Sequence, residues 1–123
     1  MTLQSPNDKD GFRLHKLMLV FRPPPDAMTF ERRWSEEFVP VAERMPGLRR
    51  VAVGRAYGGP SGPSDVYLMH EFYFDDEEAL RRAMTSPEGQ QAGRALMEFA
   101  ARHVSLTFAE HLEEERPVPG RAG

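Results

Sequence analysis

One amphipathic stretch, Thr29–Leu48, limits the folds that this chain can adopt. Its large apolar side chains recur at spacings of three or four residues, and they are Phe30, Trp34, Phe38, Val41 and Met45. These spacings match the 3.6-residue period of an α-helix, and most of the intervening positions are charged or polar. Because such a helix must bury its apolar stripe, we expect a sheet to pack against it.

Proline and capping residues give this helix its expected limits. Pro40 has no N–H to donate to the carbonyl of Glu36, a loss of about 3 kcal/mol in a regular helix. We therefore expect a kink or a restart at Pro40. Asp26 and Thr29 are both suitable N-cap residues, and Pro46-Gly47 closes the helix.

The remaining periodic segments predict four strands and a second helical region. The strands are Leu14–Arg22, Leu48–Tyr57, Val66–Phe74 and Val104–His111. Asp75 and Glu78 have the spacing of a capping box, and Ser86-Pro87 begins a further helix. The order strand, helix, strand, strand, helix, strand predicts an α+β protein with the ferredoxin-like βαββαβ fold. In that fold a four-stranded antiparallel sheet carries its helices on one face.

The first and third strands are apolar on both sides, which indicates that both faces of the sheet are covered. The face away from the helices would hold Met18, Val20, Met69 and Tyr73. An open apolar face of this kind is unfavourable in water. Pairing two sheets about a two-fold axis would cover it, so we expect a homodimer in the form of a dimeric α/β barrel.

Composition excludes several classes of partner. A net charge of −3 and a pI near 5.8 argue against a nucleic-acid surface. The chain has no cysteine, which excludes disulfides and thiolate metal sites. Its longest apolar run, Leu17–Phe21, is too short to cross a bilayer, and the first residues lack a secretory pattern. We therefore expect no membrane partner and a cytoplasmic location.

Three segments of this sequence resemble the EthD family, over about His15 to Glu110. They are H-K-L-M-L-V-F-R-P-P-P-D-A-M-T-F, then F-E-R-R-W-S-E-E-F-V-P with the P-G-L-R-R after it, and F-Y-F-D-D-E-E-A-L-R-R-A-M-T-S-P-E-G followed by Phe99. The resemblance implies small dimeric α/β-barrel proteins that are associated with ether degradation and loosely classed as oxidoreductases. In the family pattern F-x-x-x-W-x-x-x-H-x-P, the histidine position is Phe38 in this chain. A benzyl group cannot transfer protons, so Phe38 either removes a chemical role or extends the apolar stripe, and the helical period favours the stripe.

Domain organisation follows from composition and from this resemblance. We expect a flexible arm over residues 1–12, an EthD-like ferredoxin-fold domain over residues 13–112 and a flexible tail over residues 113–123. The loop from Gly58 to Ser64 is rich in glycine and proline, and we interpret it as a connector rather than a lid.

His70 and His15 are the candidate catalytic residues, because their strand positions direct both side chains toward the helices. Between helices and sheet, a pocket lined by Trp34, Phe38 and Leu96 would suit a flat apolar ligand. The alternative is that a backbone carbonyl satisfies each imidazole, or that it is exposed at a strand end.

Two tyrosines and the remaining two histidines are expected to have structural roles. Tyr67 and Tyr73 are expected on the opposite face as interface residues, and His103 and His111 end a helix and a strand. No histidine pair has the spacing of metal ligands, and no phosphate-binding loop is present, so we expect no cofactor and no metal.

Three classes of function remain open at this stage. The first is a cofactor-free oxidoreductase, such as a monooxygenase, or an isomerase of a small aromatic or polyketide-like molecule, by analogy with the wider barrel superfamily. The second is a non-catalytic binding or accessory protein. The third is a module that only dimerises.

Overall fold

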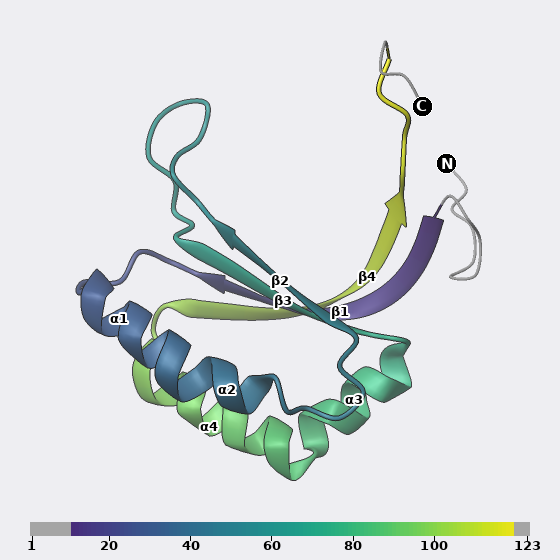
Figure 1. The fold of residues 1–123 in the computed structure, drawn as a ribbon. Coiled ribbons are helices and arrows are strands. Elements are labelled where there is room, and N and C mark those ends of the chain that lie inside the picture. Colours follow the sequence, from purple (N-terminus) through teal and green to yellow (C-terminus); the bar gives the residue numbers. More distant parts are fainter. Residues whose placement is uncertain (1–10, 120–123) are drawn as a thin grey trace.

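The computed structural model describes residues 11–119 of the chain, and the elements follow the predicted order (Figure 1). They are β1 (Gly11–Phe21), α1 (Ala27–Arg33), the π-helical turn η1 (Trp34–Phe38), α2 (Val39–Ala42), β2 (Arg50–Arg55), β3 (Leu68–Phe74), α3 (Glu77–Thr85), α4 (Pro87–Ala100) and β4 (Val104–Glu114). The four strands form one sheet in the order β2-β3-β1-β4, and every neighbouring pair is antiparallel. The predicted ferredoxin-like α+β fold is confirmed.

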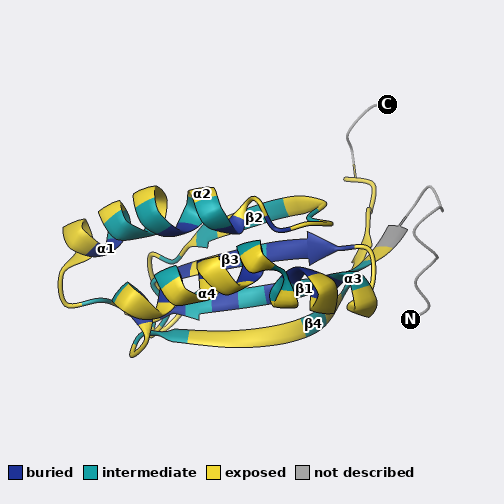
Figure 2. Ribbon diagram, turned by 90° about the horizontal axis from the view of Figure 1, so that it is seen from below, coloured by how far each residue is buried: buried dark blue, intermediate teal, exposed yellow. Residues whose placement is uncertain are grey.

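All helices lie against one face of the sheet, and the other face is open and concave because β1 and β4 curve away from the helices (Figure 1). Burial is concentrated on the two central strands, β3 and β1 (Figure 2). Leu19, Phe21, Leu68, Phe72 and Phe74 are fully covered, and they project from these strands toward the helices. The core of the described chain is therefore the layer between helices and sheet.

Strand register confirms which residues share the open face. Val20 pairs with Met69, and Met18 and Tyr73 lie at open-face positions of the same ladder. Tyr67, in contrast, was predicted on this face, and that prediction is wrong. Its ring meets the Phe30 ring edge-on at 5.5 Å, on the helix side. The alternation fails there because β3 begins only at Leu68, so Tyr67 is not part of the pleated strand.

The long helix restarts next to Pro40, as expected. The N–H of Val39 donates to the carbonyl of Trp34, five residues back, which is the hydrogen-bond pattern of a π-turn. Pro40 then occupies the first turn of α2, where a missing N–H leaves no helical bond unmade. The wider turn thus lets one continuous helical segment contain a proline.

Side-chain caps set the helix starts. Of the two candidates for α1, Asp26 is the cap, since its carboxylate accepts the Thr29 N–H at 3.2 Å. Ser86 caps α4 by accepting the Gly89 N–H at 3.0 Å, which confirms that prediction. The predicted start of α3 at Asp75 is wrong by one residue. Asp76 is the N-cap, and its carboxylate accepts the Ala79 N–H at 2.8 Å.

The two long strands extend beyond their predicted limits. Gly11 pairs with Glu114, so the sheet includes residues assigned to the arm and the tail. The strand ends are polar, so their apolar pattern is too weak to mark them. The rest of the expected arm, residues 1–10, and the last four residues of the tail lie outside the described part of the chain.

The loop from Gly58 to Ser64 stands on the side of the sheet away from the helices (Figure 1). Gly59 and Gly62 close it with two backbone hydrogen bonds, of 2.7 and 3.2 Å. In this position it does not cover the layer between helices and sheet. Across residues 11–119, the helices are too short or too polar to cross a membrane.

Candidate functional site

His70 is the only buried polar or charged residue within residues 11–119, with 1% of its surface exposed. It lies on β3 among the core residues that face the helices. The indole N–H of Trp34 donates to its Nδ1 at 3.1 Å. Its Nε2 has no hydrogen-bond partner among the described residues. Buried polar atoms are nearly always paired, so this unpaired nitrogen needs an explanation.

Aromatic rings enclose the His70 imidazole. The Phe72 ring stacks on it with centroids 4.3 Å apart, and the Phe38 ring meets it edge-on at 6.0 Å. Burial in these surroundings lowers the pKa of His70 to about 4. The imidazole is therefore neutral at pH 7, where it is a poor proton acceptor but can hydrogen-bond a bound molecule.

A cavity of about 30 Å³ lies between helices and sheet, and its wall includes Phe38 and Phe72, the rings that contact the His70 imidazole. His70 itself does not line it. Every residue that lines it is apolar or glycine, including Phe38, Phe72 and Leu96. Two of the three predicted wall residues, Phe38 and Leu96, are thus on its surface, and Trp34 instead contacts His70. One water needs roughly 10–15 Å³, so a flat ligand would enter only if side chains move.

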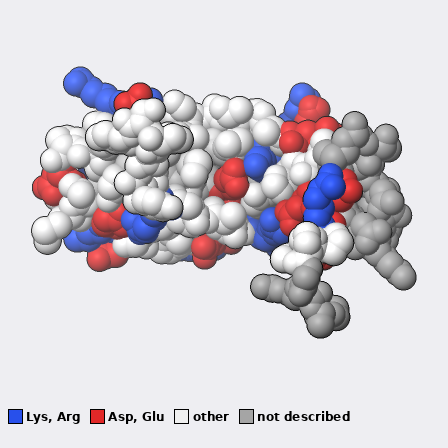
Figure 3. Space-filling view, turned by 90° about the horizontal axis from the view of Figure 1, so that it is seen from above, with Lys and Arg blue, Asp and Glu red and all other residues white. Residues whose placement is uncertain are grey.

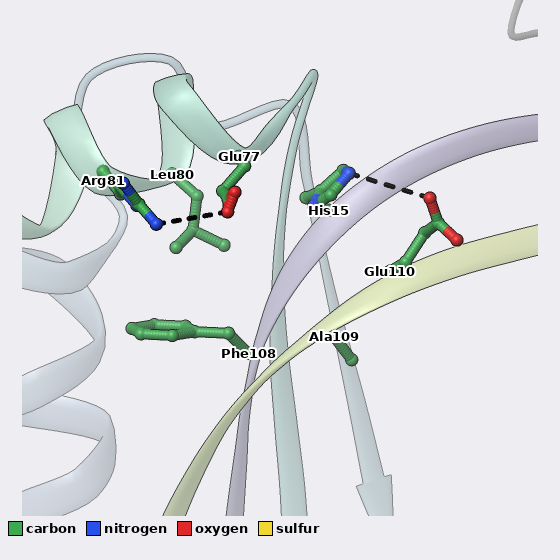
Figure 4. Close-up of a pocket in the computed structure, with 7 residues that line it drawn as sticks. All are labelled: His15, Glu77, Leu80, Arg81, Phe108, Ala109 and Glu110. Atoms are coloured by element: carbon green, nitrogen blue, oxygen red, sulfur yellow. Dashed lines mark hydrogen bonds and ion pairs between the residues drawn. The ribbon is translucent and has the colours of Figure 1, made fainter.

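His15 lies elsewhere, in a surface pocket of about 250 Å³ between α3, β1 and β4 (Figure 4). Its Nε2 is 4.0 Å from a carboxylate oxygen of Glu110. Arg81 pairs with Glu77 on the facing helix at 3.3 Å, and Leu80 and Phe108 supply apolar surface. The charged pairs are well exposed, where ion pairs contribute only about 0–1 kcal/mol.

The structure does not bring the two candidate histidines together. Leu19 pairs with His70 and His15 pairs with Phe74, so four positions of the β1–β3 ladder separate the imidazoles. At 3.3 Å per residue this separation is about 13 Å. Both side chains face the helix side of the sheet, as the alternation predicts, but they cannot act on one small group.

A polar cluster beside Trp34 is not predicted by any pattern in the sequence. Both terminal nitrogens of Arg55 donate to Glu31, at 2.7 and 2.8 Å, and the Tyr67 hydroxyl donates to the same carboxylate at 2.5 Å. The hydrogen bond from Arg55 lowers the pKa of Glu31, and the bond to Glu31 raises the pKa of Tyr67. The guanidinium carbon of Arg55 lies 5.6 Å from the centroid of the Trp34 ring. These residues come from α1, β2 and the position just before β3, so no local motif reveals them.

The open face also carries a network that sequence reasoning missed. Lys16 bonds Glu71 at 2.9 Å and His111 at 3.2 Å, and the Tyr73 hydroxyl donates to Glu71 at 2.8 Å. Burial alone would raise the pKa of Glu71, but the bonds from Lys16 and Tyr73 lower it. Figure 3 looks onto this face, which is largely uncharged with charged side chains near its middle and toward the projecting end of β1 and β4. Every polar atom named here has a partner, which indicates a structural network.

Metal ligation has no support in the described chain. Within residues 11–119, no three histidine, aspartate or glutamate side chains gather in a way that would hold an ion. That the protein works without a cofactor remains a prediction.

The sheet order and the helices on one face of the sheet define a class, the ferredoxin-like α+β proteins. The family model for the EthD domain matches residues 22–103. The chain belongs to the EthD family.

Known relatives agree with this membership. An ethyl tert-butyl ether D (EthD) family protein from Bacillus halodurans is 36% identical, with a TM-score of 0.78 over 80% of this chain and 98% of its own. An uncharacterised 11.0 kDa protein of Rhodococcus erythropolis, from the thcB-thcC intergenic region, is 27% identical over 86% of this chain and all of its own.

More distant solved structures share the fold alone. SnoaB, a cofactor-independent oxygenase from Streptomyces nogalater, has a TM-score of 0.51 and 17% identity over 89% of this chain and 98% of its own. A dimeric ferredoxin-like protein of unknown function from Jannaschia has a TM-score of 0.57 and 18% identity over 79% and 97% of the two chains.

Proposed function

We propose that this EthD family protein is a homodimer that binds a small, flat, apolar molecule between helices and sheet and converts it without a cofactor. The reaction class is that of an oxidoreductase of the monooxygenase type, or an isomerase, in the cytoplasm. The observation that carries the proposal is the buried, unpaired Nε2 of His70, whose ring contacts Phe38 and Phe72, two wall residues of an apolar cavity. An unpaired buried donor costs about 1–3 kcal/mol, which a purely structural histidine would avoid.

The monooxygenase form needs no co-reactant other than dioxygen. Dioxygen is the oxidant, and the substrate supplies the electrons. A ring CH₂ becomes a C=O, and the second oxygen atom leaves as water. The contribution of this chain would be to exclude bulk water with its apolar lining and to hydrogen-bond an oxygen on which charge develops, through neutral His70. The cofactor-independent oxygenase with the same fold supports this class by analogy only.

The alternative is a non-catalytic binding protein, and two observations favour it. The cavity lining contains no charged or polar side chain, and Phe38 occupies the position of the family histidine. A base that removes a proton from the substrate is therefore missing from the cavity wall.

Dimer formation would cover the open sheet face. Relatives of the same fold from Jannaschia and Bacteroides fragilis are described as dimeric, which supports a dimer here. The uncharged stretches of the open face around Met18 and Val20 would lie against the partner sheet.

One assay separates the two functions. The purified protein is incubated with a panel of small aromatic ketones and hydroquinones, with and without a chelator, while dissolved oxygen and products are measured. The proposal predicts product formation that resists the chelator and falls at least tenfold in His70→Phe. Ligands that bind saturably and are recovered unchanged would instead identify a binding protein.

A further inference from the structure

The hydrogen bond from Trp34 decides which nitrogen of His70 carries the proton. An indole N–H can only donate, so Nδ1 of His70, 3.1 Å from it, must be the acceptor. A neutral imidazole has one proton, and it therefore resides on Nε2. Burial keeps the ring neutral by lowering its pKa to about 4. The unpaired atom of His70 is thus an N–H donor and not an acceptor.

The orientation of Trp34 is held from the sheet edge. Arg55 lies near the indole ring and is itself fixed by two hydrogen bonds to Glu31, whose carboxylate also accepts the Tyr67 hydroxyl. Charge-assisted bidentate pairs have defined geometry, so Arg55 restricts the positions open to the indole. This chain of contacts leads from α1 and β2 to the Nδ1 of His70.

The surroundings of the Nε2–H determine what it can recognise. Phe72 stacks on the imidazole and Phe38 meets its edge, so a bound molecule must offer aromatic or apolar surface. A donor selects an acceptor and rejects another donor. An anionic oxygen would be costly to bury in these apolar surroundings, so a neutral acceptor fits better.

We propose that this site selects small flat molecules with a neutral carbonyl oxygen, aromatic ketones or quinones, which accept the Nε2–H of His70, and that Trp34 is the positioning residue that keeps the proton there. The proposal rests on the proposed function for the location of the ligand. The cavity measures about 30 Å³ and His70 does not line it. Binding to Nε2 therefore requires Phe38, which lines the cavity and contacts the imidazole, to move aside. Phe38 ends the π-turn, a kind of turn that often occurs at functional sites.

The test compares two probes of the same shape. Acetophenone carries a carbonyl oxygen where α-methylstyrene carries a CH₂ group. Affinities for both are measured with the wild type, His70→Phe, Trp34→Phe and, as a control, Tyr57→Phe, which changes an exposed loop residue. One buried hydrogen bond should favour acetophenone about tenfold more in the wild type than in His70→Phe. Tyr57→Phe should keep the wild-type ratio, and Trp34→Phe should reduce it.

Nitrogen-15 spectra of the His70 ring add a readout that a structural role would not move, and the wild type alone already gives a decisive result. The wild type should show the Nε2–H tautomer, with an Nε2 shift on addition of acetophenone but not of α-methylstyrene. Trp34→Phe should give a mixture of tautomers.

Two results would overturn the inference while leaving the cavity as a ligand site. One is saturable binding of both probes with the same ratio in wild type and His70→Phe, and the other is an Nδ1–H tautomer in the wild type. Absence of binding by either probe, together with no turnover in the oxygen assay, would remove the inference and the proposed function alike.

Discussion

Acid should destabilise this protein through His70 before its carboxylates are protonated. The folded state keeps this imidazole neutral, with a pKa near 4 against an ordinary value of 6.5. Between these pH values the unfolded chain binds more protons than the folded chain. The free energy of unfolding therefore increases as the pH rises and decreases as the pH falls. The full difference is on the order of 3 kcal/mol, of which about 2 kcal/mol should be lost between pH 7 and pH 5.

The side chains in contact with His70 simplify this experiment. Its aromatic neighbours Trp34, Phe38 and Phe72 do not titrate, so burial alone causes the shift. Carboxylates such as Glu31 and Glu71 have pKa values below 4.5 and contribute at lower pH. These two carboxylates therefore titrate below the pH window in which protonation of His70 acts.

Urea unfolding of the wild type and of His70→Phe at pH 7, 6 and 5 measures the effect. The other three histidines contribute equally to both proteins, so the difference in slope belongs to His70. If the free energy of unfolding changes equally with pH in the wild type and in His70→Phe, the reasoning is refuted. If His70→Phe does not fold, an NMR titration of the His70 ring in the wild type replaces the comparison. Protonation of His70 above pH 6 would then contradict the prediction.

The remaining predictions concern packing and assembly. Phe38→Ala should cost about 3–5 kcal/mol in urea unfolding and Phe38→His less, because Phe38 is 3% exposed in the core; equal costs would argue against a packed ring. Light scattering should give about twice the 14.0 kDa chain mass, and Met18→Asp should yield monomers; a wild type that stays monomeric at micromolar concentration would contradict the dimer. Gly89→Ala should destabilise strongly, since its Cβ would collide with the carbonyl oxygen of Ala83, while Gly93→Ala, with nothing within 4 Å, should stabilise by about 1 kcal/mol. Equal melting temperatures for the two glycine variants would contradict that packing.

Sequence patterns predicted the layers of this fold well because they report local periodicity. The stripe from Phe30 to Met45 gave the long helix and its buried face, and Ser86-Pro87 gave the start of α4. The shift from Asp75 to Asp76 at the start of α3 is a limit of the same reasoning. Two adjacent aspartates offer the same chemistry, and tertiary contacts choose between them.

The candidate site was predicted in part. Alternation placed His70 and His15 on the correct face, but their separation depends on how β1 pairs with β3, which no local pattern encodes. The Trp34–His70 hydrogen bond joins residues 36 apart in sequence. The cluster of Glu31, Arg55 and Tyr67 likewise requires the folded chain, because its members come from different elements.

A ligand of this protein should bind against His70 inside the protomer, and intermolecular nuclear Overhauser effects with acetophenone would locate it. We expect contacts from the probe ring to Phe38 and Phe72, with a shifted Nε2–H signal of His70. Contacts confined to the pocket of His15 and Phe108, or to the open sheet face around Met18, would contradict it.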